Sequence, residues 1–177
     1  MKYSIGIDIG GTNTCFGLVN ENAEIIYQSA IKTKDFPVLE DYLTILVKQI
    51  KDLIAHCPEP ENILGVGIGA PNGNFYKGSI ELAPNLPFKG IIPMKNMLEM
   101  LLLNEGWNLK VTLTNDANAA GIGEMIYGGA KGVNDFILIT LGTGVGSAIV
   151  SNGKMIYGHD GFAGEVGHTI VQIGGRE

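Results

Sequence analysis

The chain has 177 residues, a formal net charge of −6 and a hydrophobic content of 45%. This length suits one ordinary domain or one and a half small ones, and so apolar a composition excludes a disordered chain. The acidic charge disfavours a nucleic-acid partner, because phosphate binding needs basic patches.

No apolar stretch reaches the ~20 residues of a membrane helix, and the start resembles no signal peptide. Cys15 and Cys57 follow no metal or redox spacing. We expect a cytoplasmic protein with reduced thiols and no membrane partner.

The first third of the chain predicts three strands and a helix. Short apolar runs separated by turn residues predict strands at 3–9, 13–20 and 24–32. Because the turns are short, these strands should form an antiparallel meander. Pro37 suits the first turn of a helix, and apolar residues then recur at helical spacing as far as about Cys57.

The remaining residues alternate strands and helices, which is typical of a mixed α/β arrangement. The patterns predict strands at 63–69, 111–114, 135–141, 143–151 and 155–157, and helices at 92–104 and 117–127. The pattern of elements restarts after Asn115. We therefore expect an N-terminal unit over 1–115 and an incomplete second unit over 116–177.

Residues 8–14, called here the first glycine turn, lie between the first two predicted strands. Two glycines allow a sharp turn whose backbone N–H groups point outward, and such clusters bind anions. Asp8 suits Mg²⁺, which prefers few carboxylates together with phosphate and water. The next predicted element is a strand and no lysine follows, so this is neither a Walker A loop nor a dinucleotide motif. The alternative is a plain hairpin. The candidate phosphate ligands are Gly10, Gly11, Thr12, Asn13 and Thr14.

A similar pattern occurs at Gly142-Thr143-Gly144, the second glycine turn, again between two predicted strands. Alone it is explained by a hairpin. Together with the first turn it predicts two loops that clasp the phosphates of a nucleotide from opposite sides of a cleft.

Three side chains are candidates for binding or activating the molecule that accepts a phosphoryl group. Asp116 follows a predicted strand at the start of a helix, where an N-cap is the commonest use of aspartate. A carboxylate between two units also suits a general base for phosphoryl transfer. Glu165 and His168 are three residues apart in a glycine-rich segment and suit a polyhydroxylated ligand, although a lone histidine there is often structural.

With these motifs the sequence resembles the ROK family of bacterial sugar kinases, its glucokinase-like members in particular. The matching segments occur in the order of that family and span almost the whole chain: residues 8–14, 83–86, 115–117, 141–146 and 164–168. The resemblance implies the actin-like (ribonuclease H-like) ATPase fold, with ATP and Mg²⁺ as cofactors and a hexose, glucose by default, as the phosphate acceptor.

The resemblance also assigns roles to individual residues. It implies that Asp116 is the catalytic base, that both glycine turns bind the nucleotide, and that His168 is a ligand of a structural zinc ion as well as a sugar contact. The sugar-contacting positions that it implies are Asn85, Asn115, Glu165 and His168. It further implies a homodimeric full-length protein.

The sequence departs from the family pattern at two places. It stops at Glu177, where the zinc-binding cysteines of the family should begin, so we expect a truncated second lobe and a fragment that is nearly inactive alone. In this chain Asn72 separates Pro71 from Gly73, whereas in the family a glycine usually follows the proline directly.

Three other readings are open at this point. A ROK-type sugar-responsive transcriptional regulator would need a DNA-binding domain, for which there is no room before Tyr3. Another actin-like ATPase would not need the segment around Glu165 and His168. A glycine-rich α/β domain without a site would not explain five motifs in one order.

Overall fold

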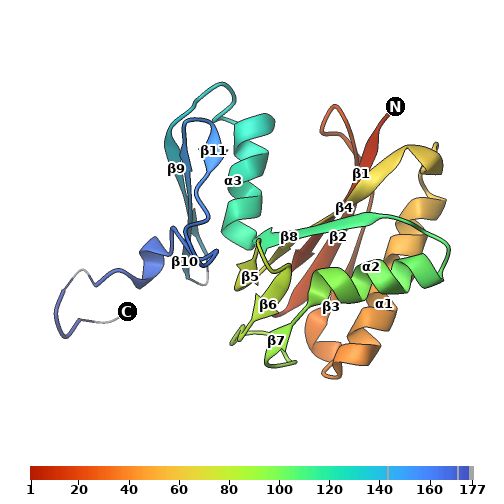
Figure 1. Cartoon of the computed structure of the whole chain (residues 1–177), viewed down its shortest axis with the longest axis horizontal. Helices are drawn as coiled ribbons and strands as arrows, with labels where there is room; N and C mark the ends of the chain where they lie inside the picture. The colour runs from red at the N-terminus through yellow and green to blue at the C-terminus, as the bar shows by residue number, and fades with distance from the viewer. Residues whose placement is uncertain (143, 171, 176–177) are drawn as a thin grey trace. The chain divides into compact units, whose positions relative to one another are not determined.

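The computed structural model describes residues 1–142, 144–170 and 172–175, and the chain divides into the units Met1–Asp116 and Ala117–Glu177 (Figure 1). Each unit contains its own β-sheet and is described separately below.

The first unit is built on a five-stranded sheet in the order β3-β2-β1-β4-β8. β1, β2 and β3 are antiparallel neighbours, which confirms the predicted meander. β4 runs parallel to β1, and β8 runs parallel to β4. The carboxyl ends of these three parallel strands therefore meet at one edge of the sheet. The strands are β1 (Tyr3–Ile9), β2 (Asn13–Asn20), β3 (Ile25–Lys32), β4 (Ile63–Ala70) and β8 (Lys110–Asn115).

Alternation of side chains explains why one face of this sheet is buried. In β1 every second residue is apolar and buried, from Tyr3 to Ile9, while the residues between them are exposed. Two helices supply the opposing apolar surface: α1 (Leu39–Ala55) and α2 (Met94–Asn104). Figure 1 shows them side by side against the sheet, and their buried residues share one hydrophobic core with β1.

The predicted helix ends differ from the observed ones by about two residues. The first helix begins at Leu39, so Pro37 lies just before it. The second was expected from residue 92, but Ile91–Ile92 forms β7 and Pro93 precedes the helix. β7 pairs with a hairpin made of β5 (Gly73–Asn74) and β6 (Ser79–Glu81). Short 3₁₀ turns occur at Thr33–Asp35, Pro60–Asn62 and Val166–His168.

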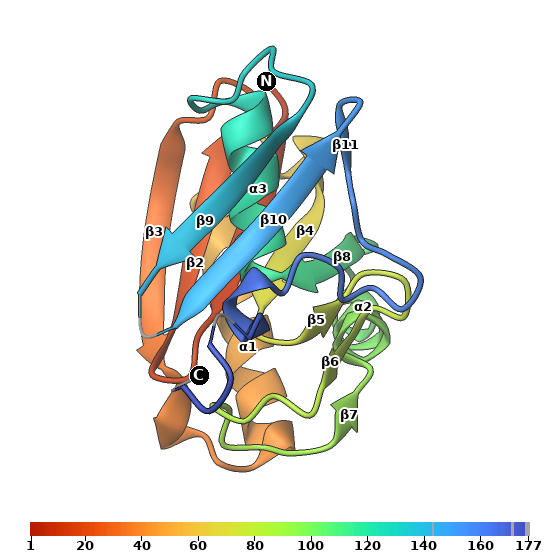
Figure 2. The same cartoon turned by 90° about the vertical axis from the view of Figure 1, so that its left-hand side faces the viewer.

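The second unit contains a three-stranded sheet in the order β11-β10-β9. Its strands are β9 (Phe136–Leu141), β10 (Val145–Ser151) and β11 (Lys154–Met155), and helix α3 (Asp116–Ile126) leads into it. α3 lies along one face of this sheet, and a Cβ built on Gly121 would be 2.8 Å from the Ala148 Cβ (Figure 2). Glycine at 121 thus permits close packing of the helix on the sheet.

Among the described residues, no helix has both the length and the apolar character that crossing a membrane would require.

Candidate functional site

The first glycine turn is held in a defined shape by its own backbone. The Gly10 N–H donates to the Asn13 carbonyl over 2.9 Å, and the Thr33 N–H donates to the Thr12 carbonyl over 2.9 Å. Gly10 therefore shapes the turn. Thr12 and Asn13 are exposed at its tip, where their polar groups can meet a ligand.

The turn lies directly against the loop that carries Asn85. A Cβ built on Gly11 would be 2.6 Å from the Asn85 carbonyl oxygen and 3.1 Å from the Asn85 Cβ. Real Cβ contacts are not so short, so only glycine fits position 11 without movement. The structure thus brings the candidate phosphate turn and a candidate sugar contact together within one unit.

The side chain of Thr14 does not fit the phosphate-binding role predicted for it. Thr14 is fully buried, and its hydroxyl lies 2.8 Å from Thr33 Oγ1 and 2.7 Å from the Tyr42 hydroxyl. Burial raises the pKa of Tyr42, so the phenol stays protonated and available for hydrogen bonding. Thr14 therefore fixes the end of the turn to the core, an outcome that the threonine type alone did not reveal.

Removing this buried hydroxyl should destabilise the chain. Thr14→Val is expected to lower the free energy of unfolding by about 1–3 kcal/mol, because two polar partners stay buried without it. Thr114→Val is the matched control: the Thr114 hydroxyl is buried and makes no hydrogen bond within the described part of the chain. That variant should be neutral or slightly stabilising. Urea unfolding followed by circular dichroism measures both, and equal losses would contradict the assigned network.

Two carboxylates occupy the edge at which the parallel strands end. Asp8 is near the end of β1, and Asp116 directly follows β8 as the first residue of α3. Partial loss of water around its carboxyl raises the pKa of Asp8, and the negative charge of Asp116 raises it further. Two acidic groups that interact in this way form a favourable environment for a divalent cation.

The raised pKa of Asp8 predicts a pH-dependent loss of stability. A carboxyl group whose pKa is higher in the folded state holds its proton more firmly there than in the unfolded chain. Its contribution to the free energy of unfolding is therefore present at low pH and is lost as pH rises. Asp8→Asn should therefore be more stable than wild type above about pH 4, the ordinary aspartate value. The gain should grow until Asp8 is fully ionised. Thermal unfolding in metal-free buffer between pH 4 and 8 measures it, and a gain that shrinks with rising pH would refute it.

The two candidate asparagines of the first unit lie on different elements. Asn85 is exposed on the loop between β6 and β7, and the Lys89 ammonium group supports this loop by donating to the Pro84 carbonyl over 2.6 Å. Asn115 is the last residue of β8, paired with Ala70 of β4. It is thus located at the same sheet edge as Asp8 and Asp116.

The second glycine turn lies in the β9–β10 connection of the second unit. The Gly142 N–H donates to the Gly144 carbonyl over 3.0 Å. A Cβ built on either glycine would have no described atom within 4 Å, so no described residue crowds the side-chain positions of these two glycines. Thr143, the third candidate in this turn, lies outside the described residues.

The segment with Glu165 and His168 is attached to β10 in the second unit. The Ser147 hydroxyl donates to the Gly164 carbonyl and accepts from the Val166 N–H over 3.1 Å. Both Glu165 and His168 are exposed. Sequence reasoning missed Ser147, whose only signal was a small polar residue three positions after the second glycine turn.

A zinc site is not assembled by the residues that the structure describes. Among them, no group of three or more histidine, cysteine, aspartate or glutamate side chains could hold a metal ion. His168 is therefore a single candidate ligand, and the residues at hand do not fit a bound zinc ion.

Comparison with known proteins identifies relatives along nearly the whole chain. The model of the ROK family matches residues 4–177. The chain is 35% identical to a glucokinase of Halalkalibacterium halodurans over 98% of its own length and 52% of the relative. It is also 35% identical to a xylose repressor of Caldicellulosiruptor bescii, over 96% of its length and 41% of the relative. The chain thus spans about half the length of these curated relatives.

Solved structures confirm the predicted fold class. A ROK family glucokinase from Streptomyces griseus, in complex with glucose and AMPPNP, aligns with a TM-score of 0.77 at 34% identity, over 97% of this chain and 51% of that one. A ROK hexokinase from Thermus thermophilus aligns with a TM-score of 0.80 at 27% identity, over 98% and 55%. The match to the family model over almost every residue shows that this chain belongs to the ROK family.

Proposed function

We propose that the protein containing this chain transfers the γ-phosphoryl group of ATP to a hydroxyl of a hexose, with glucose as the default substrate. The observation that carries the proposal is the close approach of Gly11 to Asn85. In this contact the first glycine turn lies beside the loop that carries Asn85, and we assign phosphate binding to the turn and sugar binding to the loop. Relatives named glucokinase support it, as does the similar structure that contains glucose and AMPPNP.

The residues of the chain supply positioning, charge and a proton acceptor, which are what phosphoryl transfer requires. The first glycine turn holds phosphate through its backbone and the exposed Thr12 and Asn13. Gly142, Thr143 and Gly144 contribute the second phosphate turn. Asp8 would hold Mg²⁺, which would supply positive charge to neutralise the phosphates.

The acceptor sugar is held by hydrogen bonds from Asn85, Asn115, Glu165 and His168. Asp116 accepts the proton of the attacking hydroxyl, so that the oxygen can form its bond to the γ-phosphorus while the bond to the ADP oxygen breaks. Zinc has no assigned part in this proposal, because His168 is its one candidate ligand among the described residues.

A coupled assay on the full gene product that contains this chain tests the activity. Production of ADP is measured with MgATP and a panel of hexoses and amino sugars. Turnover with at least one sugar is expected, and none with any sugar would refute the proposal. The same assay on the 177-residue chain should show almost no turnover, because a half-enclosed nucleotide stays accessible to water.

The alternative is a sugar-responsive transcriptional regulator, since proteins named xylose repressor also occur among the relatives. The presence of Asp116 opposes it, because a sensor needs no general base. Gel-shift binding of the full gene product to its own promoter, released by a sugar, would support the regulator. Cytoplasmic location, homodimerisation and a bound zinc ion in the full protein stay predictions.

A further inference from the structure

A second close backbone approach lies beside Asp116, on the hairpin where the sequence departs from the family. A Cβ built on Gly73 would meet the Thr114 carbonyl, with its carbon only 2.6 Å away and the Asn115 nitrogen 2.9 Å away. Gly73 thus rests on the peptide bond that joins the last two residues of β8. The next residue along the chain is Asp116.

Steric exclusion alone requires glycine at this position. Gly73 lies in the short strand β5, and its backbone does not occupy the positive-φ region that favours glycine. An alanine here would therefore add one methyl group without straining its own backbone. Since the atoms it meets belong to the main chain, β5 or the end of β8 must move.

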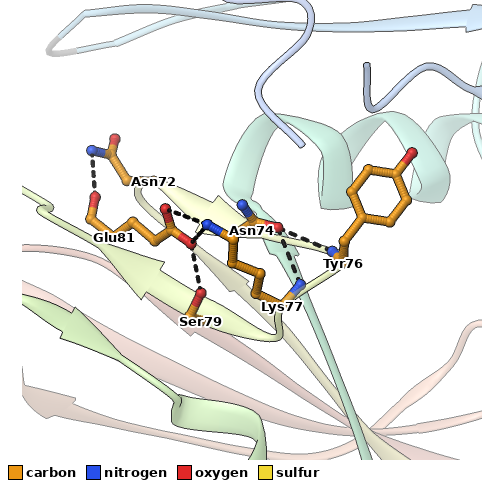
Figure 3. Close-up of polar contacts among 6 residues, drawn as sticks. All are labelled: Asn72, Asn74, Tyr76, Lys77, Ser79 and Glu81. Carbon is orange, nitrogen blue, oxygen red and sulfur yellow. Dashed lines mark hydrogen bonds and ion pairs between the residues drawn. The ribbon is translucent and has the colours of Figure 1, made fainter. Parts of the chain in front are cut away.

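The hairpin is fixed by polar contacts on both sides of Gly73 (Figure 3). Asn72 donates from Nδ2 to the Glu81 carbonyl over 3.0 Å, and its own carbonyl accepts from the Glu81 N–H over 3.1 Å. Asn74 is fully buried, and its Oδ1 accepts from the N–H groups of Tyr76 and Lys77 over 3.1 and 3.2 Å.

The side chain of Glu81, in the second strand of the hairpin, contacts Lys77 in the turn and Ser79 in the same strand. One of its carboxylate oxygens lies 3.1 Å from the Lys77 ammonium nitrogen and 2.9 Å from the Ser79 hydroxyl (Figure 3). The hairpin is thus braced by its own polar contacts, while Thr114 and Asn115 pair with Gly69 and Ala70 of β4. With both segments held, we expect part of the displacement caused by a bulkier residue at 73 to fall on the end of β8.

We propose that Gly73 is a positioning residue: its backbone sets where β8 ends and so fixes Asn115 and Asp116 against the acceptor hydroxyl. This inference rests on the proposed sugar kinase function. Proton transfer in phosphorylation needs Asp116 within hydrogen-bond reach of one particular hydroxyl. Misplacement by about 1 Å can lower a rate by about 10²-fold.

The test compares Gly73→Ala with Gly78→Ala in the full gene product. Gly78 lies in the same hairpin, has a φ of +63° and would place a Cβ 2.7 Å from the Lys95 Cβ, so its variant strains the hairpin away from β8. Gly73→Ala should lower kcat by about 10²-fold and raise the KM for the sugar, with the KM for MgATP unchanged. Gly78→Ala should lower the melting temperature but leave both KM values and kcat within about twofold.

A milder variant keeps the proposal testable if Gly73→Ala does not fold. Asn72→Gly removes the side-chain brace, adds no atoms and suits the φ of +51° at this position, so kcat should fall several-fold and the sugar KM should rise. Normal kcat and sugar KM in both Asn72→Gly and a folded Gly73→Ala would overturn the proposal. Equal losses of kcat in Gly73→Ala and Gly78→Ala with unchanged KM values would also overturn it, because they indicate only general destabilisation.

Hydrogen exchange separates this proposal from the proposed function. The peptide covering residues 113–118 should exchange faster in Gly73→Ala than in wild type, and at the wild-type rate in Gly78→Ala. If the wild-type protein phosphorylates no sugar, the function fails. This exchange pattern then still decides whether Gly73 positions the end of β8, and an unchanged peptide would overturn the inference.

Discussion

Asp116→Asn is expected to lower kcat by about 10²–10⁴-fold in the full gene product, because a positioned general base contributes about that much. Asparagine keeps the size of the side chain and one accepting oxygen but cannot accept the proton of the sugar hydroxyl. Sugar affinity should therefore change little. The negative charge that raises the pKa of Asp8 is also removed, so Mg²⁺ binding should not strengthen in compensation.

The measurement pairs steady-state kinetics with calorimetric titration of the sugar. Asp41→Asn is the control: Asp41 is an exposed aspartate in the first turn of α1, and its loss should leave kcat unchanged. An Asp116→Asn protein that binds sugar and turns over at the wild-type rate would remove Asp116 from the catalytic role. In that case the remaining role for the residue is at the start of the helix.

Gly11→Ala should produce the second large effect, a loss of about 10²-fold in kcat/KM. The new methyl group would lie 2.6 Å from the Asn85 carbonyl oxygen, so the phosphate turn and the sugar loop must separate. Because both ligands contact these two segments in the proposed function, the KM values for MgATP and for sugar should rise together. This result differs from the one expected for Gly73→Ala, in which the KM for MgATP should stay unchanged.

Gly17→Ala provides the matched control for Gly11→Ala. A Cβ built on Gly17 has as its nearest neighbour the Val19 Cγ2 at 3.9 Å, an ordinary van der Waals contact within β2. This variant should retain wild-type kinetics and a melting temperature within a few degrees. Wild-type kinetics in Gly11→Ala as well would show that the contact with Asn85 has no functional importance.

Local patterns in the sequence were sufficient for the elements of the fold. Strand alternation in Tyr3–Ile9 and helical spacing from Leu39 onward depend on which side of an element faces the core, and that information is local. The turn residues likewise predicted the meander that pairing confirms. The start of the second helix was predicted less well, because an apolar residue such as Ile92 suits a helix and a strand equally. In the structure Ile92 pairs with Ile80 of β6 and so belongs to strand β7.

Roles of side chains depended on neighbours that are distant in sequence. Thr12 and Thr14 look alike in the first glycine turn, but one is exposed and the other is buried against Tyr42, 28 residues away. The same limit applies to Gly73, whose need for glycine arises from Thr114 on another strand. A pattern of residue types contains no record of such contacts.

The sequence by itself determined the α/β class, the meander, the two glycine turns and the family, because these follow from local periodicity and from motifs in a fixed order. The tertiary structure alone decided that Gly11 rests on Asn85, that Thr14 belongs to the core, and that Gly73 supports the end of β8. The physical reason is that two atoms cannot occupy the same space. Which side chains are restricted in this way depends on which segments, distant in sequence, come into contact in the folded chain.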